Sequence, residues 1–492
     1  MLEEELLTLI ETIQRRGCEG QTTEVKAAAK GCPEKLYDTM SSFSNQDDGG
    51  VFVFGLDETQ HFEAVGVYNA QDLQKRVMEQ GEQMTPIVRP IFTVCDRDGK
   101  VFVSAEITPV DLAERPCYKT AKGRLKGSYK RVGDADKPMT EYEVYSYEAY
   151  RKRYREDARE AVGATLEFLV SEEVNSYMAH MRSERPNLAA TGEAQQLELC
   201  GITNKGRITL SALLLFGVYP QALYPRLCIA AARIPGEIKG TTDEQGNRFS
   251  DSESIIGTLP DMLERAMDFV RRNMRIAIGI NPNTGQRQET PEYPPVAVRE
   301  AILNALMHRD YSRYNEDKPI LLEMYDDRLE VINPGGLYGR TTIEQLGHTQ
   351  PDTRNTLLVT MMERLGKAEN RYSGIPTIRR LLTQSRLPNP KFEDNYDEFR
   401  VTLFNKRERS AHSSISTANT NDVEAKLLAF CRTPRSRDEI AAYLGIASVQ
   451  YAMRRYILPL IESGSVRMTL PESPRSRSQR YVTVEMQGRP RT

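Results

Sequence analysis

Hydrophobic positions recur with two different periods along this chain, and the change from one to the other marks out its parts. Over residues 1–16 the apolar positions follow helical spacing, which predicts an amphipathic packing helix. From 17 to about 145 short apolar runs follow strand periodicity, with helical stretches at 33–46 and 71–82 between some of them. This mixture predicts a compact α/β domain at 1–145.

The middle of the chain is more polar. A charged run at 147–178 mixes both signs with helical periodicity, and we interpret it as a solvated helical strut. An apolar helix and strand follow at 210–236, and an amphipathic helix is expected at 262–274. The polar segment KRERSAHSSISTANTN predicts a linker. The predicted organisation is therefore 1–145, a helical connector with a middle α/β element at 146–285, a domain at 286–405, the linker at 406–421 and a C-terminal module at 422–492.

The stretch 291–337 carries the clearest chemistry. Its helical pattern places Glu300 and Asn304 one turn apart, so both side chains project from one helix face. A strand pair is predicted at 320–325 and 328–332, and it ends in the turn NPGG. A carboxylate and an amide can hold a water and a divalent ion, and a glycine pair lets the backbone approach a ligand. Each feature alone could be a solvated helix face or an ordinary turn. Together they indicate a nucleotide pocket.

This stretch resembles the ATP-binding fold shared by DNA gyrase, the heat-shock chaperone ATPases, histidine kinases and MutL. More specifically, REAILNALMHRDY, DRLEVINPGGL, a downstream Arg-Asn pair and ENRYSGI resemble bacterial RecG-like or Schlafen-type ATP-binding regulators. The resemblance implies a GHKL-like α/β sandwich that binds ATP and Mg²⁺. Glu300 would be the water-activating base and Asn304 the magnesium ligand. Asn333 would stand where the wider superfamily has its adenine-reading carboxylate. The remaining expected nucleotide contacts are His308, Arg309, Asp310, Gly335, Gly336, Arg354, Asn355 and Gly374.

Two departures from that pattern bear on turnover. Asn333 carries no charge, although its amide oxygen can still accept from an exocyclic amine. Tyr372 replaces the first glycine of the phosphate loop, which leaves Gly374 to supply any positive φ there. Nucleotide binding is therefore expected, and slow hydrolysis remains an open alternative. Residues 338–372 are polar and flanked by glycines, and we expect them to form a lid.

The N-terminal domain carries a second resemblance. Glu19, Glu24 and Lys26, then SSFSNQDDGGVFVFGLD and YKRVGDADKPMT, resemble the Schlafen AlbA-type domain. The resemblance implies nucleic-acid binding, and in the Schlafen branch RNA cleavage by three acidic residues. Carboxylates grouped around Mg²⁺ or Mn²⁺ suit that chemistry. Glu19, Glu24 and Asp57 are the candidates. The alternative is that Glu24 and Lys26 are an ordinary strand pair and Glu19 caps a loop.

The C-terminal module predicts a winged helix-turn-helix. Helices are expected at 423–431, 437–443 and 448–463, followed by two strands around an Arg/Ser/Pro loop. Such a domain places its second helix in the major groove of DNA while the wing contacts phosphates. The alternative is a dimerisation module. The candidate nucleic-acid contacts are Gln450, Arg454 and Arg455 on the helix, and Arg475, Arg477 and Arg480 on the wing.

Composition and charge narrow the range of possible functions. The 492 residues carry a formal charge of −3, so nucleic-acid contact requires local basic patches. Seven scattered Cys, no signal-like start and no long apolar window fit a cytoplasmic protein without a membrane span. Gly99-Lys100 and Gly366-Lys367 lack the hydroxyl residue of a P-loop, so a helicase motor is excluded.

These observations lead to one favoured function and one alternative. We expect a multidomain α/β and α+β protein that acts as an ATP-binding, DNA-binding transcriptional regulator, as a homodimer or higher homo-oligomer. Weak ATP hydrolysis is the enzymatic activity left open. The alternative is a Schlafen-like, metal-dependent RNA endonuclease regulated by ATP, with a role in phage defence.

Overall fold

The computed structural model describes residues 1–280, 286–349, 351–367, 373–395, 397–405, 427–443, 453–462, 465–469 and 479–483. The chain divides into two compact units, Met1–Lys406 and Arg407–Thr492. The predicted linker 406–421 and Tyr372 lie outside the described residues. No helix in the described part of the chain is long and apolar enough to cross a membrane.

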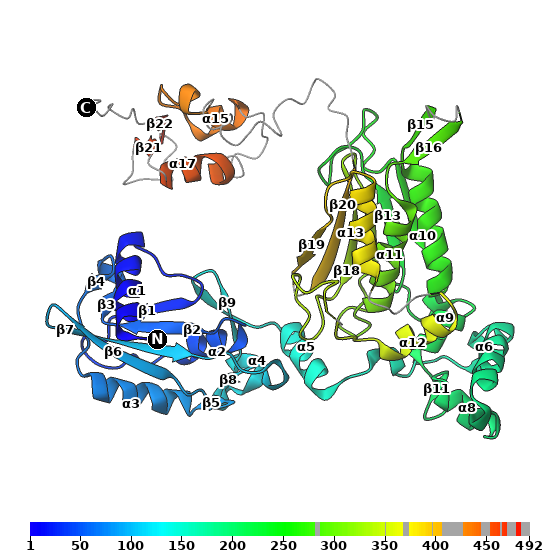
Figure 1. The fold of residues 1–492 in the computed structure, drawn as a ribbon, viewed down its shortest axis with the longest axis horizontal. Coiled ribbons are helices and arrows are strands. Elements are labelled where there is room, and N and C mark those ends of the chain that lie inside the picture. Colours follow the sequence, from blue (N-terminus) through cyan, green and yellow to red (C-terminus); the bar gives the residue numbers. More distant parts are fainter. Residues whose placement is uncertain are drawn as a thin grey trace. The chain divides into compact units, whose positions relative to one another are not determined.

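The N-terminal domain is built on a four-stranded sheet covered on both faces (Figure 1). Alternation along the second strand explains this: Phe52 and Phe54 enter one core, and Val53 enters the other. The first core lies under two helices and the second under the N-terminal helix, so the three predicted helices are confirmed. In sheet order the strands are β1 (Thr23–Lys26), β2 (Gly50–Phe54), β7 (Lys100–Ile107) and β6 (Ile91–Arg97), and the helices are α1 (Glu3–Arg16), α2 (Tyr37–Asn45) and α3 (Ala70–Gly81).

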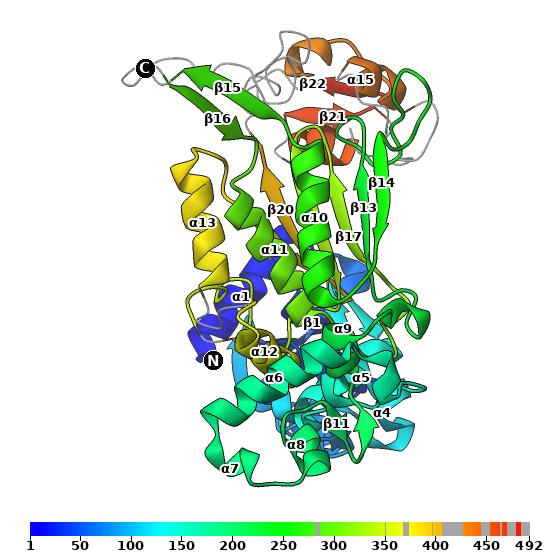
Figure 2. The same cartoon turned by 90° about the vertical axis from the view of Figure 1, so that its right-hand side faces the viewer.

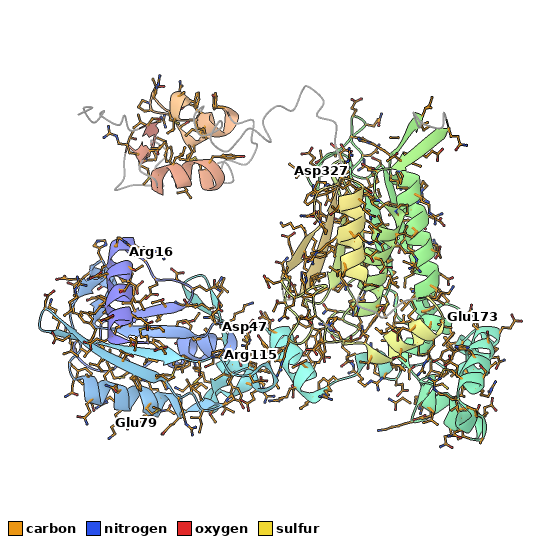
Figure 3. All side chains as sticks on the ribbon, viewed as in Figure 1. Arg16, Asp47, Glu79, Arg115, Glu173 and Asp327 are labelled. Carbon is orange, nitrogen blue, oxygen red and sulfur yellow. The ribbon has the colours of Figure 1, made fainter. Side chains whose placement is uncertain are left out.

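Short strand pairs complete this domain. A buried arginine, Arg115, fixes the segment that follows β7. Arg115 donates to the carbonyls of Val110 and Gln46, each at 3.1 Å, and lies 2.8 Å from the Asp47 carboxylate (Figure 3). These bonds hold the segment after β7 against the end of α2. The short elements are β3 (Leu56–Asp57) with β4 (Glu63–Ala64), β5 (Met84–Thr85) with β8 (Tyr118–Lys119), α4 (Gly123–Gly127), and the hairpin β9 (Tyr129–Val132) with β10 (Ala135–Pro138).

The charged run at 147–178 is not one helix. Helix α5 (Glu141–Lys152) begins at a Thr140–Glu143 capping box and ends at Arg153, whose φ is +51°. The following backbone then pairs elsewhere, Glu160 with Thr209 and Leu169 with Gly217, so it cannot continue the helix. The connector contains α6 (Ser171–Glu184), α7 (Pro186–Ala189), α8 (Glu193–Leu199), the pair β11 (Thr203–Asn204) and β12 (Arg207–Ile208), and α9 (Leu210–Phe216).

A six-stranded sheet forms the centre of the larger domain, and helices lie against one of its faces (Figure 2). All neighbouring strands are antiparallel except β13 and β17. In sheet order the strands are β14 (Asp251–Ile255), β13 (Ile229–Arg233), β17 (Ile320–Met324), β18 (Arg328–Pro334), β20 (Glu398–Phe404) and β19 (Lys391–Asp394); the helices are α10 (Leu259–Asn273), α11 (Pro295–His308) and α13 (Gly374–Gln384).

This sheet confirms the predicted strand pair, which forms β17 and β18. The two helices expected in this region are also confirmed, and they form α10 and α11. However, β13, β14 and α10 come from the middle element, so the sheet extends beyond the segment 286–405. A separate hairpin, β15 (Ile276–Ile280) with β16 (Arg287–Pro291), links α10 to α11.

The segment 338–372, expected to form a lid, contains a helix that packs into the core. Residues 338–349 form neither helix nor strand, but 356–364 form α12 (Thr356–Arg364), whose Leu358, Val359, Met361 and Met362 are buried in the main core. The buried Asp157 carboxylate accepts from the Leu357 and Leu358 backbone amides at 2.6 and 3.1 Å and so caps this helix. A helix held in this way is part of the scaffold.

The C-terminal unit places helical segments before an antiparallel strand pair, in the predicted order. Residues 427–430 are helical, and the structure describes only 453–462 of the third predicted helix. A small core joins Leu427, Cys431, Ile440, Ile457 and Tyr481. The elements are α15 (Arg437–Tyr443), the π-helical turn η7 (Met453–Ile457), α17 (Leu458–Glu462), β21 (Val466–Met468) and β22 (Tyr481–Thr483).

The cap on α12 gives a test of the fold. Replacing Asp157 with Ala leaves two amides at a buried helix start without an acceptor, which costs about 1–3 kcal/mol. The free energy of opening of 356–364, measured by hydrogen exchange, should fall by that amount. Asp157→Asn keeps an acceptor oxygen and should lose much less. Equal losses in the two variants would contradict the capping role.

Candidate nucleotide site

A cavity of about 160 Å³ is lined by residues of α11, the end of β18, the loop after it and the start of α13. Figure 1 shows where these elements lie in the larger domain. Eight of the eleven residues expected to contact nucleotide line the cavity. They are Glu300, Asn304, His308, Asn333, Gly335, Gly336, Arg354 and Gly374. The two ends of this cavity differ in chemistry.

The polar end lies between α11 and α13. Glu300 and Asn304 share one face of α11, and Gly374 is the first residue of α13. A Cβ atom on Gly374 would lie 3.0 Å from both Glu300 Oε2 and Asn304 Nδ2. Gly374 therefore permits close approach to the two side chains. It is not among the residues with positive φ, so the expectation that it supplies a left-handed turn is wrong.

The other end is apolar and contains one unsatisfied acceptor. Val331 pairs with Val401 across β18 and β20, and Asn333 pairs with Phe399. All four residues line the cavity. Asn333 is 5% exposed, and its Oδ1 is buried without a hydrogen-bond partner in the described structure. An unmet acceptor of this kind is costly, which suits a site where a ligand supplies the donor.

Gly335 forms the floor between these ends. Its φ is +92°, which glycine adopts readily, and a Cβ there would lie 2.5 Å from Asp310 Cβ and 2.6 Å from Arg354 Nη1. Any side chain would displace this ion pair. The glycine is thus required by the packing beneath the cavity as well as by its backbone conformation.

Arg354 and Asp310 form a buried ion pair under that floor. Arg354 Nη1 lies 3.4 Å from Asp310 Oδ2, and Nη2 donates to the Gly336 carbonyl at 3.1 Å. Burial opposes ionisation of Asp310, but the Arg354 cation and donors including Tyr142 outweigh it, so the pKa of Asp310 is lowered. Asp310 does not line the cavity and acts by holding Arg354.

The other two residues expected to contact nucleotide lie outside the cavity. Arg309 is buried and donates to the carbonyls of Asn315 and Lys318. Asn355 Nδ2 donates to the carbonyls of Met307 and Arg309 at 2.9 and 2.7 Å. Both side chains stabilise the turn after α11. Membership of a motif did not distinguish such scaffolding residues from cavity residues.

His308 does line the cavity, at the end of α11. Burial and the nearby Arg354 cation lower its pKa to about 4. The imidazole is therefore neutral at physiological pH, so one ring nitrogen can donate a hydrogen bond and the other can accept one.

The loop after β18 contributes cavity residues that the sequence did not single out. Tyr338, Thr341 and Asp352 line the cavity, and the Arg354 guanidinium carbon lies 5.1 Å from the centre of the Tyr338 ring. Asp352 accepts from the Arg340 backbone amide at 2.8 Å, which folds the loop back on itself. Their only sequence signal is that they fall within the segment 338–372, which was expected to form a lid.

In the N-terminal domain an arginine lies among the acidic candidates. Arg131, from β9, lies 2.8 Å from Glu24 Oε2, 3.6 Å from Glu19 Oε2 and 3.1 Å from Asp136 Oδ1. Its side chain is 1% exposed. Glu19 also accepts from the Val25 amide at 2.7 Å. Burial raises the pKa of Glu19 to about 7, and the neighbouring Glu24 charge adds to this effect.

Asp57, the third acid of the nuclease hypothesis, bonds within its own turn. It accepts from the Thr59 amide at 3.0 Å and from the side chains of Thr59 and Gln60 at 2.7 Å. Among the described residues, no group of three or more His, Cys, Asp or Glu side chains is arranged to hold a metal ion. The structure instead groups Asp136, which the sequence reasoning missed, with Glu19 and Glu24 around Arg131.

Most of the nucleic-acid candidates of the C-terminal unit lie outside the residues that the structure describes. Gln450, Arg475 and Arg477 lie outside the described residues, as do the side chains of Arg454 and Arg455. Arg480 is described, next to β22. Its backbone amide donates to Thr469 Oγ1 at 3.1 Å. The assignments of these six residues to nucleic-acid contact stay predictions.

Comparison with known families agrees with two of the three predicted modules. Residues 19–140 match the family model "Schlafen, AlbA_2", and residues 317–403 match HATPase_c_4, "Putative ATP-dependent DNA helicase recG C-terminal". Residues 421–483 match "Filamentation induced by cAMP protein Fic-like, C-terminal domain". The winged helix in that segment therefore stays a prediction.

Matches to solved structures are more distant. The DIP2311 protein from Corynebacterium diphtheriae is 19% identical over 94% of this chain and 93% of its own, with a TM-score of 0.39. The N-terminal domain of a RecG-related protein from Nitrosomonas europaea is 22% identical over 28% of this chain and 94% of its own, with a TM-score of 0.23. No curated protein matches the chain.

Substitution of Arg131 is expected to lower the local stability of the charged cluster around it. Arg131→Met leaves buried carboxylates without their cation, which costs about 3 kcal/mol. Hydrogen exchange of 129–138 should report that loss. Lys26→Met is the matched control, because Lys26 also pairs with Glu24 but is 29% exposed, and such pairs contribute about 0–1 kcal/mol. Similar effects of both substitutions would contradict the central place of Arg131.

Proposed function

We propose that this chain, in which a Schlafen AlbA_2-type segment precedes a RecG C-terminal ATPase-like segment, is an ATP-responsive DNA-binding transcriptional regulator. ATP with Mg²⁺ would bind in the cavity described above and alter the arrangement of the attached domains. The observation that carries the proposal is the pairing of an apolar end holding the unsatisfied Asn333 Oδ1 with a polar end formed by Glu300, Asn304 and the start of α13.

The residues present suit that ligand. A purine is flat and apolar on its faces, with polar atoms at its edge, which matches the Val331–Val401 wall beside Asn333. At the other end the N-terminus of the 11-residue α13 favours phosphate through its free amides and dipole. Glu300 and Asn304 offer the oxygen ligands that Mg²⁺ prefers. Bound magnesium would neutralise phosphate charge.

A set of contacts connects the cavity to α5, the helix that follows the N-terminal domain. The Tyr142 hydroxyl donates to Asp310 Oδ2 at 2.7 Å, and Asp310 holds Arg354. Tyr150 packs edge-on against Tyr338, which lines the cavity, with ring centres 5.5 Å apart. A ligand that moves Arg354 or Tyr338 would therefore act on α5. A ligand shifts an equilibrium only by binding one state better, and these contacts are where two states could differ.

A second link runs directly from the cavity loop to the N-terminal domain. Arg340 donates to both carboxylate oxygens of Asp111, at 3.1 and 2.9 Å. Asp111 caps the turn Leu112–Glu114, which packs against α5. The pair is exposed and contributes little energy by itself. Its value for the proposal is its position, because it joins the loop and the N-terminal domain at the place where α5 already connects them.

Nucleic-acid binding is supported by a basic and aromatic cluster in the N-terminal domain. Lys119 and Lys122 lie 4.3 and 4.2 Å from the centre of the Tyr37 ring, and Tyr129 packs against Tyr37 with ring centres 6.1 Å apart. The lysines are suited to contact phosphates. The aromatic rings are suited to stack on bases. The six C-terminal candidates named from the sequence would supply further contacts.

Calorimetric titration of the full chain tests nucleotide binding. With Mg²⁺ present, wild type should bind ATP, and Asn304→Ala should weaken binding by about tenfold or more, because a metal ligand is lost. Without Mg²⁺ the two proteins should bind similarly. Asn247→Ala, at an exposed residue bonded to Asp243 outside the cavity, should behave as wild type. Absence of binding by wild type would disprove the proposal. If ATP is hydrolysed, Glu300→Gln should abolish turnover while ATP still binds.

Hydrogen exchange tests the link through α5. ATP should protect residues 141–152 in wild type, and Tyr142→Phe should remove most of that protection, because its hydroxyl bond to Asp310 is lost. ATP affinity should change by no more than about threefold, since Tyr142 does not line the cavity. Tyr145→Phe is the matched control, because the Tyr145 hydroxyl bonds to Glu156 at 2.7 Å instead. Equal protection in both variants would contradict the route through Asp310.

A further inference from the structure

At the apolar end of the cavity the polar group is the neutral amide of Asn333. A carboxylate at the same place would restrict more strictly which bases could bind. Asn333 Oδ1 is buried and unsatisfied, and the side chain is 5% exposed. A carboxylate at this position could only accept, so it would require a donor such as the exocyclic amine of adenine. An amide presents an acceptor and, after a 180° rotation, a donor. Asn333 can therefore pair with either kind of group.

We propose that Asn333 makes the site tolerant of the group at position 6 of the purine, so that it binds 6-oxopurine triphosphates as well as ATP. This inference rests on the proposed function, because it concerns the base of the nucleotide bound there. Asn333 is the specificity-determining residue: its amide accepts from the 6-amino group of adenine or donates to the 6-oxo group of hypoxanthine or guanine.

Inosine triphosphate gives the sharpest test, because it replaces the 6-amino group of ATP by an oxo group without adding the 2-amino group of GTP. The dissociation constants of ATP and inosine triphosphate are measured with Mg²⁺ on the full chain. In wild type they should differ by less than about tenfold. In Asn333→Asp the preference for ATP should rise by a further ten- to hundredfold, because the carboxylate repels the oxo group and cannot donate to it.

Asn333→Ala is a second variant that keeps the test valid if the charged variant does not fold. It removes the amide without adding a charge, so affinity for both nucleotides should fall while their ratio stays close to that of wild type. A wild-type preference for ATP of tenfold or more overturns the proposal, and so does an unchanged ratio in Asn333→Asp. If neither nucleotide binds wild type, the proposed function itself fails. If ATP binds and inosine triphosphate does not, only the inference about the base fails.

Discussion

The buried ion pair between Arg354 and Asp310 is the interaction on which the candidate site depends. It lies beneath Gly335, and it reaches the cavity through Arg354 and α5 through Tyr142. Taking both charges out of water is costly, and the surrounding bonds from Tyr142, Asn315 and Ser312 offset that cost. A pair that needs so many partners fixes the relative positions of all of them. The position of the cavity floor and that of the start of α5 both depend on this one ion pair.

The N-terminal domain uses a buried arginine in a similar way, with a different result. Arg131 draws Glu19, Glu24 and Asp136 together. Arg131 contacts all three carboxylates, but a single guanidinium offsets only part of their combined charge. In the larger domain Arg354 pairs with the single carboxylate of Asp310 and also donates to the Gly336 carbonyl. The first cluster joins elements of the N-terminal domain, while the second lies beneath the cavity.

Local patterns allowed much of this to be predicted. Helical spacing located α1, α10 and α11, and strand patterns located β17 and β18, because neighbours in sequence determine those elements. Glu300 and Asn304 followed from the same spacing. The contact of Arg131 with Glu24 could not be predicted, since it depends on how β9 packs against the distant strand β1. Asp136 lies opposite Arg131 in the β9–β10 hairpin, and that pairing was missed because the hairpin register was not worked out. The roles of Arg309 and Asn355 were missed for a related reason: a sequence motif records neither which way a side chain points nor which carbonyl it bonds.

The strand order of the six-stranded sheet has a consequence for how this protein reaches its native state. The parallel partners β13 and β17 are separated by the whole of α10, the β15–β16 hairpin and α11. Closing so long a loop costs entropy before any contact repays it, and folding slows as contacts become less local. Until that pairing forms, β17 has an open edge bearing Ile320 and Leu322, which are buried in the finished sheet. During synthesis β13 therefore emerges well before its partner β17, and the cavity can be assembled only after the whole of the segment between them has emerged.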